Sequence, residues 1–172
     1  MSLTVIDNFL HKDVYVTLRN IVINDQMNWN FNPGNVEVNK KSNDYVFTHL
    51  IFYNGIILSD KYEYLLKNII WKLPNFAALN RAKFNLNTKC SNKIMPTGWH
   101  KDYEWNLDYS YTALLYLSTT DGPTEFYYDG KTKKVECIDN RVVIFPTETM
   151  HQGYTPCNSS ARYALNINYF IQ

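Results

Sequence analysis

A series of short runs with the composition of β-strands fills the second half of the chain, and it limits the possible folds more than any other feature. The runs cover residues 81–90, 111–118, 124–128, 133–138, 141–146 and 161–171. Turn sequences stand between them, including "DGP" at 121–123 and "DG" at 129–130. Strands this short and this closely spaced favour an antiparallel sandwich or barrel against which helices pack.

The first 79 residues carry the predicted helices. Local patterns predict strands at 3–10 and 45–53 and helices at 12–24 and 59–74. The second helix has the clearer boundaries, with Ser59 as N-cap and Pro74 as the stop. A polar stretch from Asn28 to Asp44 predicts a long loop. With 172 residues in all, the chain fits a single α+β domain that is mainly β.

Charge and cysteine content exclude several classes of protein. A formal net charge of +1 provides no basic surface for nucleic acid or acidic membranes. Cys90, Cys137 and Cys157 form no CxxC pair and are odd in number, which argues against a disulfide framework or a thiolate zinc site. The N-terminus "MSLTVIDNFL" does not have the pattern of a signal peptide, and no apolar run is long enough to cross a membrane. We therefore expect a soluble, cytoplasmic protein.

Two of the predicted strands have one unexpectedly polar face. In the strand at 161–171 this face carries Arg162, Ala164, Asn166, Asn168 and Phe170. In the strand at 81–90 it carries Arg81, Lys83, Asn85 and Asn87. Such alternation fits a sheet with one solvated side, and it also fits a barrel interior that holds a charged ligand.

The motif "HKD" at 100–102 supplies two metal-ligand side chains. His100 and Asp102 have the spacing that places both on one face of an extended strand. A third ligand has to come from a distant segment, and His151 follows the strong strand at 141–146, whereas His11 and His49 stand at positions that fit structural roles. Two histidines and one carboxylate are typical of non-haem Fe(II) oxygenases. The same set also serves zinc hydrolases, although these usually carry HExxH on a helix.

Arg162 comes eleven residues after His151 and opens the polar face of the last strand. A guanidinium holds a carboxylate through two parallel hydrogen bonds, which an oxygenase that uses 2-oxoglutarate needs for the far carboxylate of this cosubstrate. A lone arginine at the start of a strand more often forms a surface ion pair. The prediction of a cosubstrate site therefore depends on the order of HxD, His151 and Arg162 along the chain.

Five ordered blocks of sequence resemble the Fe(II)/2-oxoglutarate-dependent oxygenases. They are "HKD" (100–102), "YTALLYLS" (111–118), "GPTEFYYDG" (122–130), "NRVVIFPTETMHQG" (140–153) and "ARYALNINYF" (161–170). The chain looks most like the prolyl-4-hydroxylase-like branch and like short stand-alone oxygenases carried by bacteriophages. The resemblance covers about residues 80–172. It implies a double-stranded β-helix (jelly-roll) core at 80–172, with residues 1–79 as supporting strands and helices of the same domain.

The resemblance also implies roles for single residues. The residues that match the iron ligands are His100, Asp102 and His151. Arg162 matches the basic residue that pairs with the far carboxylate of the cosubstrate, and Tyr116 matches a tyrosine that hydrogen-bonds the same carboxylate. Asn166, where the family often has threonine, and Asn85, on the preceding polar strand, are expected to contact cosubstrate or substrate.

The reaction that the resemblance implies is hydroxylation of an unactivated C–H bond. Its requirements are Fe(II), 2-oxoglutarate and O₂, with ascorbate as a reductant, and its by-products are succinate and CO₂. The expected substrate is a peptide, a protein (a prolyl residue in particular) or a small molecule. Nucleic acid is not expected, because Asn168 stands where nucleic-acid demethylases of this superfamily carry a second arginine.

Several aromatic residues flank the ligand motif: Trp99, Tyr103, Trp105, Tyr109 and Tyr111. They fit a cradle for a substrate proline, and equally a set of core side chains. Two further classes of protein fit the same residues. One is a non-catalytic jelly-roll module that binds a metal or ligand, and the other is a zinc-dependent hydrolase.

Overall fold

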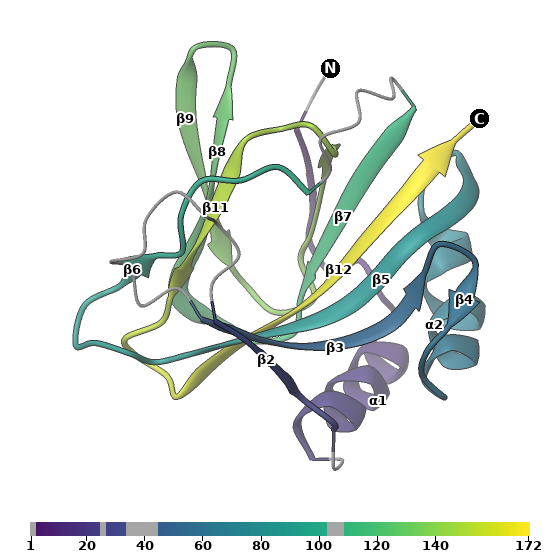
Figure 1. Cartoon of the computed structure of the whole chain (residues 1–172), viewed down its shortest axis with the longest axis horizontal. Coiled ribbons are helices and arrows are strands. Elements are labelled where there is room, and N and C mark those ends of the chain that lie inside the picture. Colours follow the sequence, from purple (N-terminus) through teal and green to yellow (C-terminus); the bar gives the residue numbers. More distant parts are fainter. Residues whose placement is uncertain (1–2, 25–26, 34–44, 103–108) are drawn as a thin grey trace.

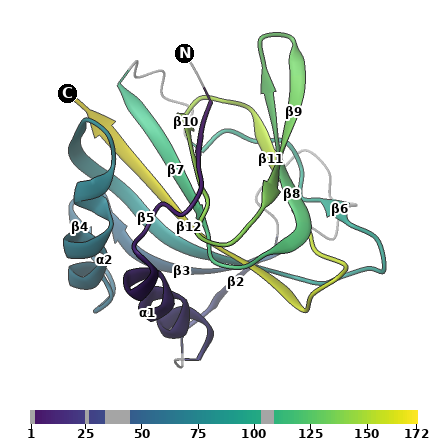
Figure 2. The same ribbon diagram turned by 180° about the vertical axis from the view of Figure 1, so that it is seen from behind.

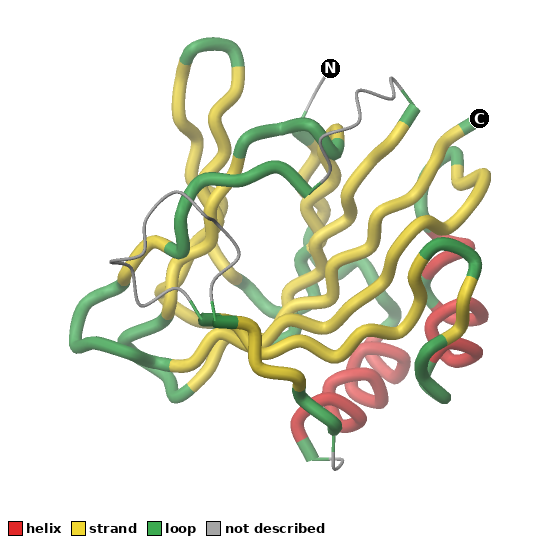
Figure 3. The backbone as a smooth tube through the Cα atoms, in the orientation of Figure 1, coloured by secondary structure: helices red, strands yellow, loops and turns green. Residues whose placement is uncertain are grey.

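The computed structural model describes residues 3–24, 27–33, 45–102 and 109–172, and in these ranges strands predominate over helices (Figure 3). The described strands form two antiparallel sheets. The larger sheet contains, in spatial order, β1 (Thr4–Ile6), β10 (Val142–Pro146), β7 (Ser110–Tyr116), β12 (Ala161–Ile171), β5 (Phe76–Thr88), β3 (Val46–Tyr53) and β2 (Asn30–Asn32), with β4 (Ile56–Ile57) paired to β3. The smaller sheet contains, in spatial order, β6 (Met95–Pro96), β11 (His151–Thr155), β8 (Thr120–Tyr128) and β9 (Lys131–Cys137).

The two sheets lie across from each other, and the helices cover the outer face of the larger one (Figures 1 and 2). The helical elements are α1 (Lys12–Ile23), α2 (Tyr62–Asn68) and a short 3₁₀ helix, η1 (Ile70–Lys72). One apolar core joins Leu18 of α1 and Leu65 of α2 to Leu165 in the centre of the larger sheet. The expected mainly β fold, a jelly-roll core with supporting N-terminal helices, is therefore confirmed.

Strand β12 separates the helix-facing core from the interior between the sheets. Its residues Leu165, Ile167 and Tyr169 belong to the core shared with the helices. The alternate side chains of Arg162, Asn166 and Asn168 point to the other face, where they are 4%, 3% and 1% exposed. The polar face that the sequence shows is thus the buried inner face of the barrel and not a solvated side of the sheet.

The neighbouring strand β5 adds a second polar row to this interior. The antiparallel register places Asn87 opposite Arg162, Lys83 opposite Asn166, and Arg81 opposite Asn168. Side chains on directly opposite residues of one sheet face lie close enough to interact. Two sequence segments about 80 residues apart are therefore combined into one polar surface.

A second, smaller apolar core lies between the sheets, beside the polar rows. It consists of Leu114, Tyr116, Phe126, Val135, Cys137, Val143, Phe145 and Ala164. No helix within the described ranges is long and apolar enough to span a membrane. The thiols of Cys90, Cys137 and Cys157 are free.

The helix predicted at 59–74 is shorter in the structure. Helix α2 begins after Lys61, not Ser59, and ends at Asn68, where the chain tightens into η1. Ser59 still contributes to the start of the turn, because its hydroxyl accepts a hydrogen bond from the Lys61 amide at 3.3 Å. Ile69 and Ile70 are both fully buried. Neighbouring side chains on an α-helix point about 100° apart, so the change of helix type allows both to reach the core.

The predicted loop at 28–44 also needs correction. Residues Asn30–Asn32 form β2, which pairs with β3 so that Phe31 stands opposite Phe47. Tyr45, Phe31 and Phe47 form a group of aromatic contacts at this edge. Residues 34–44 lie outside the described ranges. Strands β4, β6 and β11 were not predicted.

Candidate metal centre

His100 and His151 come from distant segments and are brought face to face by a pair of backbone hydrogen bonds. The His100 amide donates to the His151 carbonyl at 2.9 Å, and the His151 amide donates to the His100 carbonyl at 2.9 Å. Directly opposite residues in an antiparallel bridge project to the same side. The two imidazole ring centres lie 4.4 Å apart. The backbone therefore sets the positions of both rings.

Asp102 completes a group of three possible metal ligands. Its amide donates to the carbonyl of Thr147, just after β10, at 3.3 Å. Its carboxylate then meets the two imidazoles, and the ligand atoms of His100, Asp102 and His151 all lie within 4.8 Å of one another. Within the described ranges this is the cluster with the donor types and spacing of a metal site.

Each imidazole has one nitrogen engaged and one available. His100 Nδ1 lies 3.1 Å from the Gly98 carbonyl, and His151 Nδ1 lies 2.9 Å from the Thr149 carbonyl. A carbonyl oxygen only accepts, so both Nδ1 atoms carry the proton and both Nε2 atoms keep a lone pair. Burial also lowers the pKa of His151 to about 4, so its ring is neutral at neutral pH. Each ring thus keeps its Nε2 available to a metal.

Four side chains hold the Asp102 carboxylate in place. Arg81 Nη2 donates to Oδ1 at 3.1 Å. The donors to Oδ2 are Thr112 Oγ1 at 2.9 Å, Asn166 Nδ2 at 3.1 Å and Asn168 Nδ2 at 3.2 Å. A buried carboxylate is stable only when its oxygens are paired in this way. The network fixes the carboxylate orientation before any metal is bound.

Asp102 is ionised despite its burial. Burial alone would raise its pKa, but the nearby charges of His151, Arg81 and Lys83 outweigh this effect and hold the pKa below the usual aspartate range. His151 is charged only at low pH. At neutral pH, where its ring is neutral, the cations that stabilise the Asp102 carboxylate are Arg81 and Lys83. The Arg81 guanidinium is also oriented by Asn168, whose Oδ1 accepts from Arg81 Nε at 2.8 Å.

Arg162 lies at the other end of the same polar interior. Its Nη2 donates to Thr124 Oγ1 at 2.7 Å, and its Nη1 donates more weakly to Asn87 Oδ1 at 3.5 Å. Its Nε has no hydrogen-bond partner. No carboxylate of the described part of the chain pairs with this 4% exposed guanidinium. A buried cation without a counter-ion marks a position for an anion.

Tyr116 stands behind Thr124 and does not line the cavity. Its hydroxyl donates to Thr124 Oγ1 at 2.8 Å, and its ring packs under the Arg162 guanidinium at 5.2 Å. Thr124 Oγ1 thus accepts from both Tyr116 and Arg162, which leaves its own O–H free to donate to a ligand. The resemblance implied that Tyr116 contacts the far carboxylate of the cosubstrate directly. In the structure Tyr116 instead contacts Thr124, and Thr124 lines the cavity.

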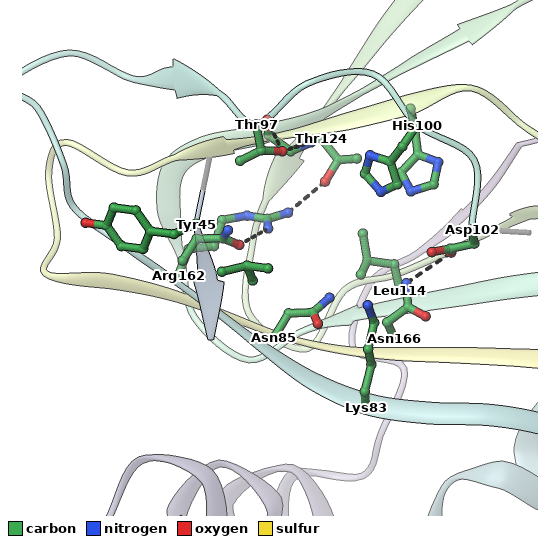
Figure 4. A pocket seen from close by; sticks show the side chains of 14 residues that line it. Tyr45, Lys83, Asn85, Thr97, His100, Asp102, Leu114, Thr124, Arg162 and Asn166 are labelled. Atoms are coloured by element: carbon green, nitrogen blue, oxygen red, sulfur yellow. Dashed lines mark hydrogen bonds between the residues drawn. The ribbon is translucent and has the colours of Figure 1, made fainter. Parts of the chain in front are cut away.

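One cavity connects the histidine pair with Arg162 (Figure 4). Its volume is about 70 Å³. The residues that line it are Tyr45, Val46, Lys83, Asn85, Asn87, Thr97, His100, Asp102, Leu114, Thr124, His151, Gly153, Arg162 and Asn166. Of the expected cosubstrate residues, Asn166 donates to Asp102, and Asn85 faces the cavity with its Oδ1 unpaired. The three expected ligands, Arg162, Asn166 and Asn85 are thus brought together here.

The other histidines and the flanking aromatic residues lie elsewhere. His49 contacts the Asn28 carbonyl and the Ser59 hydroxyl, and His11 is exposed beside Asp13. Tyr111 packs against Tyr169 in the helix-facing core. Tyr109 is 59% exposed. Trp99 is partly buried, and Tyr103 and Trp105 lie outside the described residues, so the aromatic cradle stays a prediction.

Several side chains of the site were not singled out from the sequence. Arg81 appeared only as a member of a polar face, and Asn168 only there and in the argument against nucleic acid. Nothing in the local sequence linked either residue to Asp102. Thr124 and Thr112 are buried on β8 and β7. A polar residue within an apolar strand, as Thr112 in "YTALLY", is the signal that could have identified them, because a buried hydroxyl needs a partner.

The fold is shared with solved structures of oxygenases. A Pseudomonas putida prolyl-4-hydroxylase is 17% identical, with a TM-score of 0.61 over 99% of this chain and 92% of that chain. An oxidoreductase of the 2OG-Fe(II) oxygenase family from Burkholderia pseudomallei is 11% identical, with a TM-score of 0.67 over 97% and 85%. A Trichoplax adhaerens prolyl hydroxylase, solved with a peptide fragment of the hypoxia inducible factor oxygen degradation domain, is 17% identical, with a TM-score of 0.64 over 98% and 83%.

Comparisons by sequence alone find no such relatives. No family model matches the chain, and no curated protein is similar to it. Identities of 11% to 17% show a common fold. The chain has the fold of the 2-oxoglutarate–Fe(II) oxygenases, including the prolyl-4-hydroxylases.

Proposed function

We propose that this protein is an Fe(II)- and 2-oxoglutarate-dependent dioxygenase that hydroxylates an unactivated C–H bond. One observation carries the proposal: a cavity has a His₂–carboxylate group at one end and a buried arginine without a counter-ion at the other. The first is a site for a divalent metal, and the second is a site for a carboxylate. The shared fold of known oxygenases supports the same assignment.

The donor set fits Fe(II). His100 and His151 each present a free Nε2, and Asp102 presents an ionised carboxylate. Three protein ligands leave further positions of an octahedral ion open. Bound iron would supply the activation of O₂, with 2-oxoglutarate converted to succinate and CO₂ as the substrate is oxidised.

The opposite end of the cavity fits the far carboxylate of 2-oxoglutarate. Arg162 offers an unpaired Nε, and Thr124 offers a hydroxyl hydrogen because its oxygen already accepts from two donors. Charge-assisted hydrogen bonds of this kind are stronger than neutral ones. Asn87 and Tyr116 keep the guanidinium and the threonine in position from behind.

Apolar side chains pack around part of the site. His151 is 4% exposed and lies against the rings of Phe126 and Phe145. Leu114 lines the cavity between its two ends. Electrostatic interactions are stronger where water is excluded. Residues 1–79 and 80–172 would act as one domain, because the helices and the sheet share a single core.

A prolyl residue in a peptide or protein is the substrate that we favour. Two of the similar structures are prolyl hydroxylases, and one of them was solved with a peptide. A small-molecule substrate is the alternative, because the fold also serves a 2-oxoglutarate-dependent carbocyclase and an epimerase of nogalamycin biosynthesis. Succinate release in the presence of a peptide library and of a metabolite library would separate these two substrate classes.

The decisive experiment is an anaerobic titration of the purified protein with Fe(II) and 2-oxoglutarate. We expect the visible charge-transfer absorption of an iron–keto-acid chelate in the wild type and its absence in His100→Ala. His11→Ala is the matched control, because His11 is exposed and remote from the cluster. Tightly bound zinc without binding of the keto acid would instead indicate a hydrolase. Chelate formation without succinate release under any substrate would indicate a binding module.

A further inference from the structure

Lys83 occupies the middle of the polar row on β5. It lies between Arg81 and Asn85 on the inner face of the strand and opposite Asn166 of β12. Its side chain lines the cavity and rises from β5 toward Leu114 and Asn166 (Figure 4). The same cavity holds the metal-ligand group, so Lys83 is a cation on the wall between the two ends of the site.

The two ends of this row have partners within the protein, but its middle does not. Arg81 is paired with Asp102, and Asn87 accepts from Arg162. Across the described residues, no hydrogen bond or ion pair joins Lys83 to a neighbour, and Asn85 Oδ1 is also without a partner. A partly buried ammonium group without a counter-ion lowers the stability of the fold.

Lys83 nevertheless keeps its charge at neutral pH. Burial, with a smaller effect of the Arg81 charge, lowers its pKa to about 8. Asp102 opposes this change, but its carboxylate is already occupied by the hydrogen bonds of Arg81, Thr112, Asn166 and Asn168. The protein therefore maintains an ammonium group that faces the cavity and forms no direct ion pair with a carboxylate of the described residues.

We propose that Lys83 binds the keto-acid carboxylate of 2-oxoglutarate, the one next to the keto group. This inference rests on the proposed function. With the far carboxylate at Arg162, the remaining carboxylate of the cosubstrate extends along the cavity toward the metal-ligand group, and Lys83 is the cation that lines this part. The cosubstrate would thus be held by a cation at each end, Arg162 and Lys83.

Two analogues of 2-oxoglutarate separate the two carboxylate sites. Levulinate keeps the keto group and the far carboxylate but has a methyl group in place of the keto-acid carboxylate. 2-Oxopentanoate keeps the keto-acid carboxylate and has a methyl group in place of the far one. Binding of both analogues and of 2-oxoglutarate would be measured by calorimetry with Mn(II), without any substrate, for the wild type and for Lys83→Met.

We expect Lys83→Met to weaken 2-oxoglutarate and 2-oxopentanoate by the same factor, about tenfold to hundredfold, because one charge-assisted hydrogen bond is lost. Levulinate should bind with the wild-type affinity. Lys83→Arg keeps the charge and should restore most of the binding. Lys133→Met, the same change at an exposed lysine of β9, is the matched control and should have no effect.

A second readout separates binding from a structural role. Methionine has a similar length and no charge, so Lys83→Met should leave the Tm of the ligand-free protein unchanged or raise it. A structural lysine would lower the Tm when replaced. Unchanged affinity for 2-oxopentanoate in Lys83→Met, or an equal loss for levulinate, would overturn the assignment. Failure of the wild type to bind 2-oxoglutarate at all would overturn the proposed function itself, and this inference with it.

Discussion

His100 and His151 offer the same ligand atom but differ in how they pack. His151 is 4% exposed and its ring lies 4.9 Å from Phe145 and 5.9 Å from Phe126, centre to centre. His100 is only partly buried. Replacing either ring removes a ligand, but replacing His151 also leaves a cavity in the apolar core between the sheets.

We therefore predict that His100→Ala, Asp102→Ala and His151→Ala each abolish turnover with Fe(II) and 2-oxoglutarate. His100→Ala should keep the wild-type Tm, whereas His151→Ala should lose about 2–4 kcal/mol of unfolding free energy through the cavity. Succinate release and urea unfolding would measure the two effects. Wild-type turnover in His151→Ala would show that the ligand set is wrong.

Thr124 links the side chains of Arg162 and Tyr116, because its hydroxyl oxygen accepts from both. Arg162→Lys keeps a charge but loses the planar group that donates two parallel hydrogen bonds to a carboxylate. We predict that it weakens 2-oxoglutarate binding by about 1.5–3 kcal/mol, a tenfold to hundredfold change. Tyr116→Phe removes only the neutral donor behind Thr124 and should cost less. The double variant should be less than additive, because both changes act on one threonine.

Anaerobic binding of 2-oxoglutarate to the two single variants and the double variant would test this prediction. Tyr127→Phe, at an exposed tyrosine of β8, is the control for removal of a tyrosine hydroxyl. If Arg162→Ala bound the cosubstrate as tightly as the wild type, the assignment of Arg162 would be wrong, and most support for this enzyme class would be lost.

Strands β8 and β11, which carry Thr124 and His151, are also joined by their side chains. Tyr154 donates to Glu125 Oε2 at 2.7 Å, and Gln152 donates to the same oxygen at 2.9 Å. The hydrogen bond from Tyr154 lowers the pKa of Glu125. Burial, followed by the Glu125 contact, raises the pKa of Tyr154 to about 12. This contact stabilises the strand pair next to the metal-ligand group.

Tyr154→Phe should therefore lose about 1 kcal/mol of unfolding free energy at neutral pH. Glu125 has a lowered pKa in the folded state, so its contribution is complete above its unfolded pKa of about 4.3 and disappears as the pH falls through the folded value. Tyr154 has a raised pKa, so its contribution is complete below about 10 and disappears as the pH rises towards about 12. Urea unfolding of both proteins should show a constant difference from about pH 5 to 9. A difference that changes across this range would contradict the prediction.

The sequence was sufficient for strands that carry an apolar face and insufficient for those that do not. Strand β12 was predicted because Leu165 and Ile167 alternate with polar residues, and helix α1 because its apolar residues recur along one side. Strand β11 has the sequence "HQGYT", which has no such pattern. It is a strand because β8 and β6 pair with its backbone, and such pairing is decided by tertiary structure.

The residues of the site also divide into those that the sequence identifies and those that it does not. His100, Asp102, His151 and Arg162 were identified because metal and carboxylate chemistry requires these residue types in this order. The role of Arg81 was not, because it depends on a register that sets β5 against β12 and brings Asp102 to their shared face. Register is a property of the folded sheet, and local sequence does not contain it.

We expect the fold as a whole to be stable without disulfides or metal. All three cysteines are free, and the helix-facing core is separate from the metal-ligand group. We predict that a reducing agent leaves the Tm unchanged and that a chelator leaves the circular dichroism spectrum of the protein unchanged. Added Mn(II) should raise the Tm, since an ion that binds the folded state stabilises it. A large drop of the Tm under reduction would contradict the expectation of a cytoplasmic protein.

Asp102 and both imidazoles are oriented by hydrogen bonds from the protein itself. A site whose ligands are already fixed before metal binding discriminates little among divalent ions of similar size. The intrinsic order of affinity then favours cobalt, nickel and copper over iron. Which ion is found would follow from supply at the time of synthesis. Preparations grown in different media, or passed over a nickel column, should therefore contain different mixtures of metals, and specific activity should follow the iron fraction.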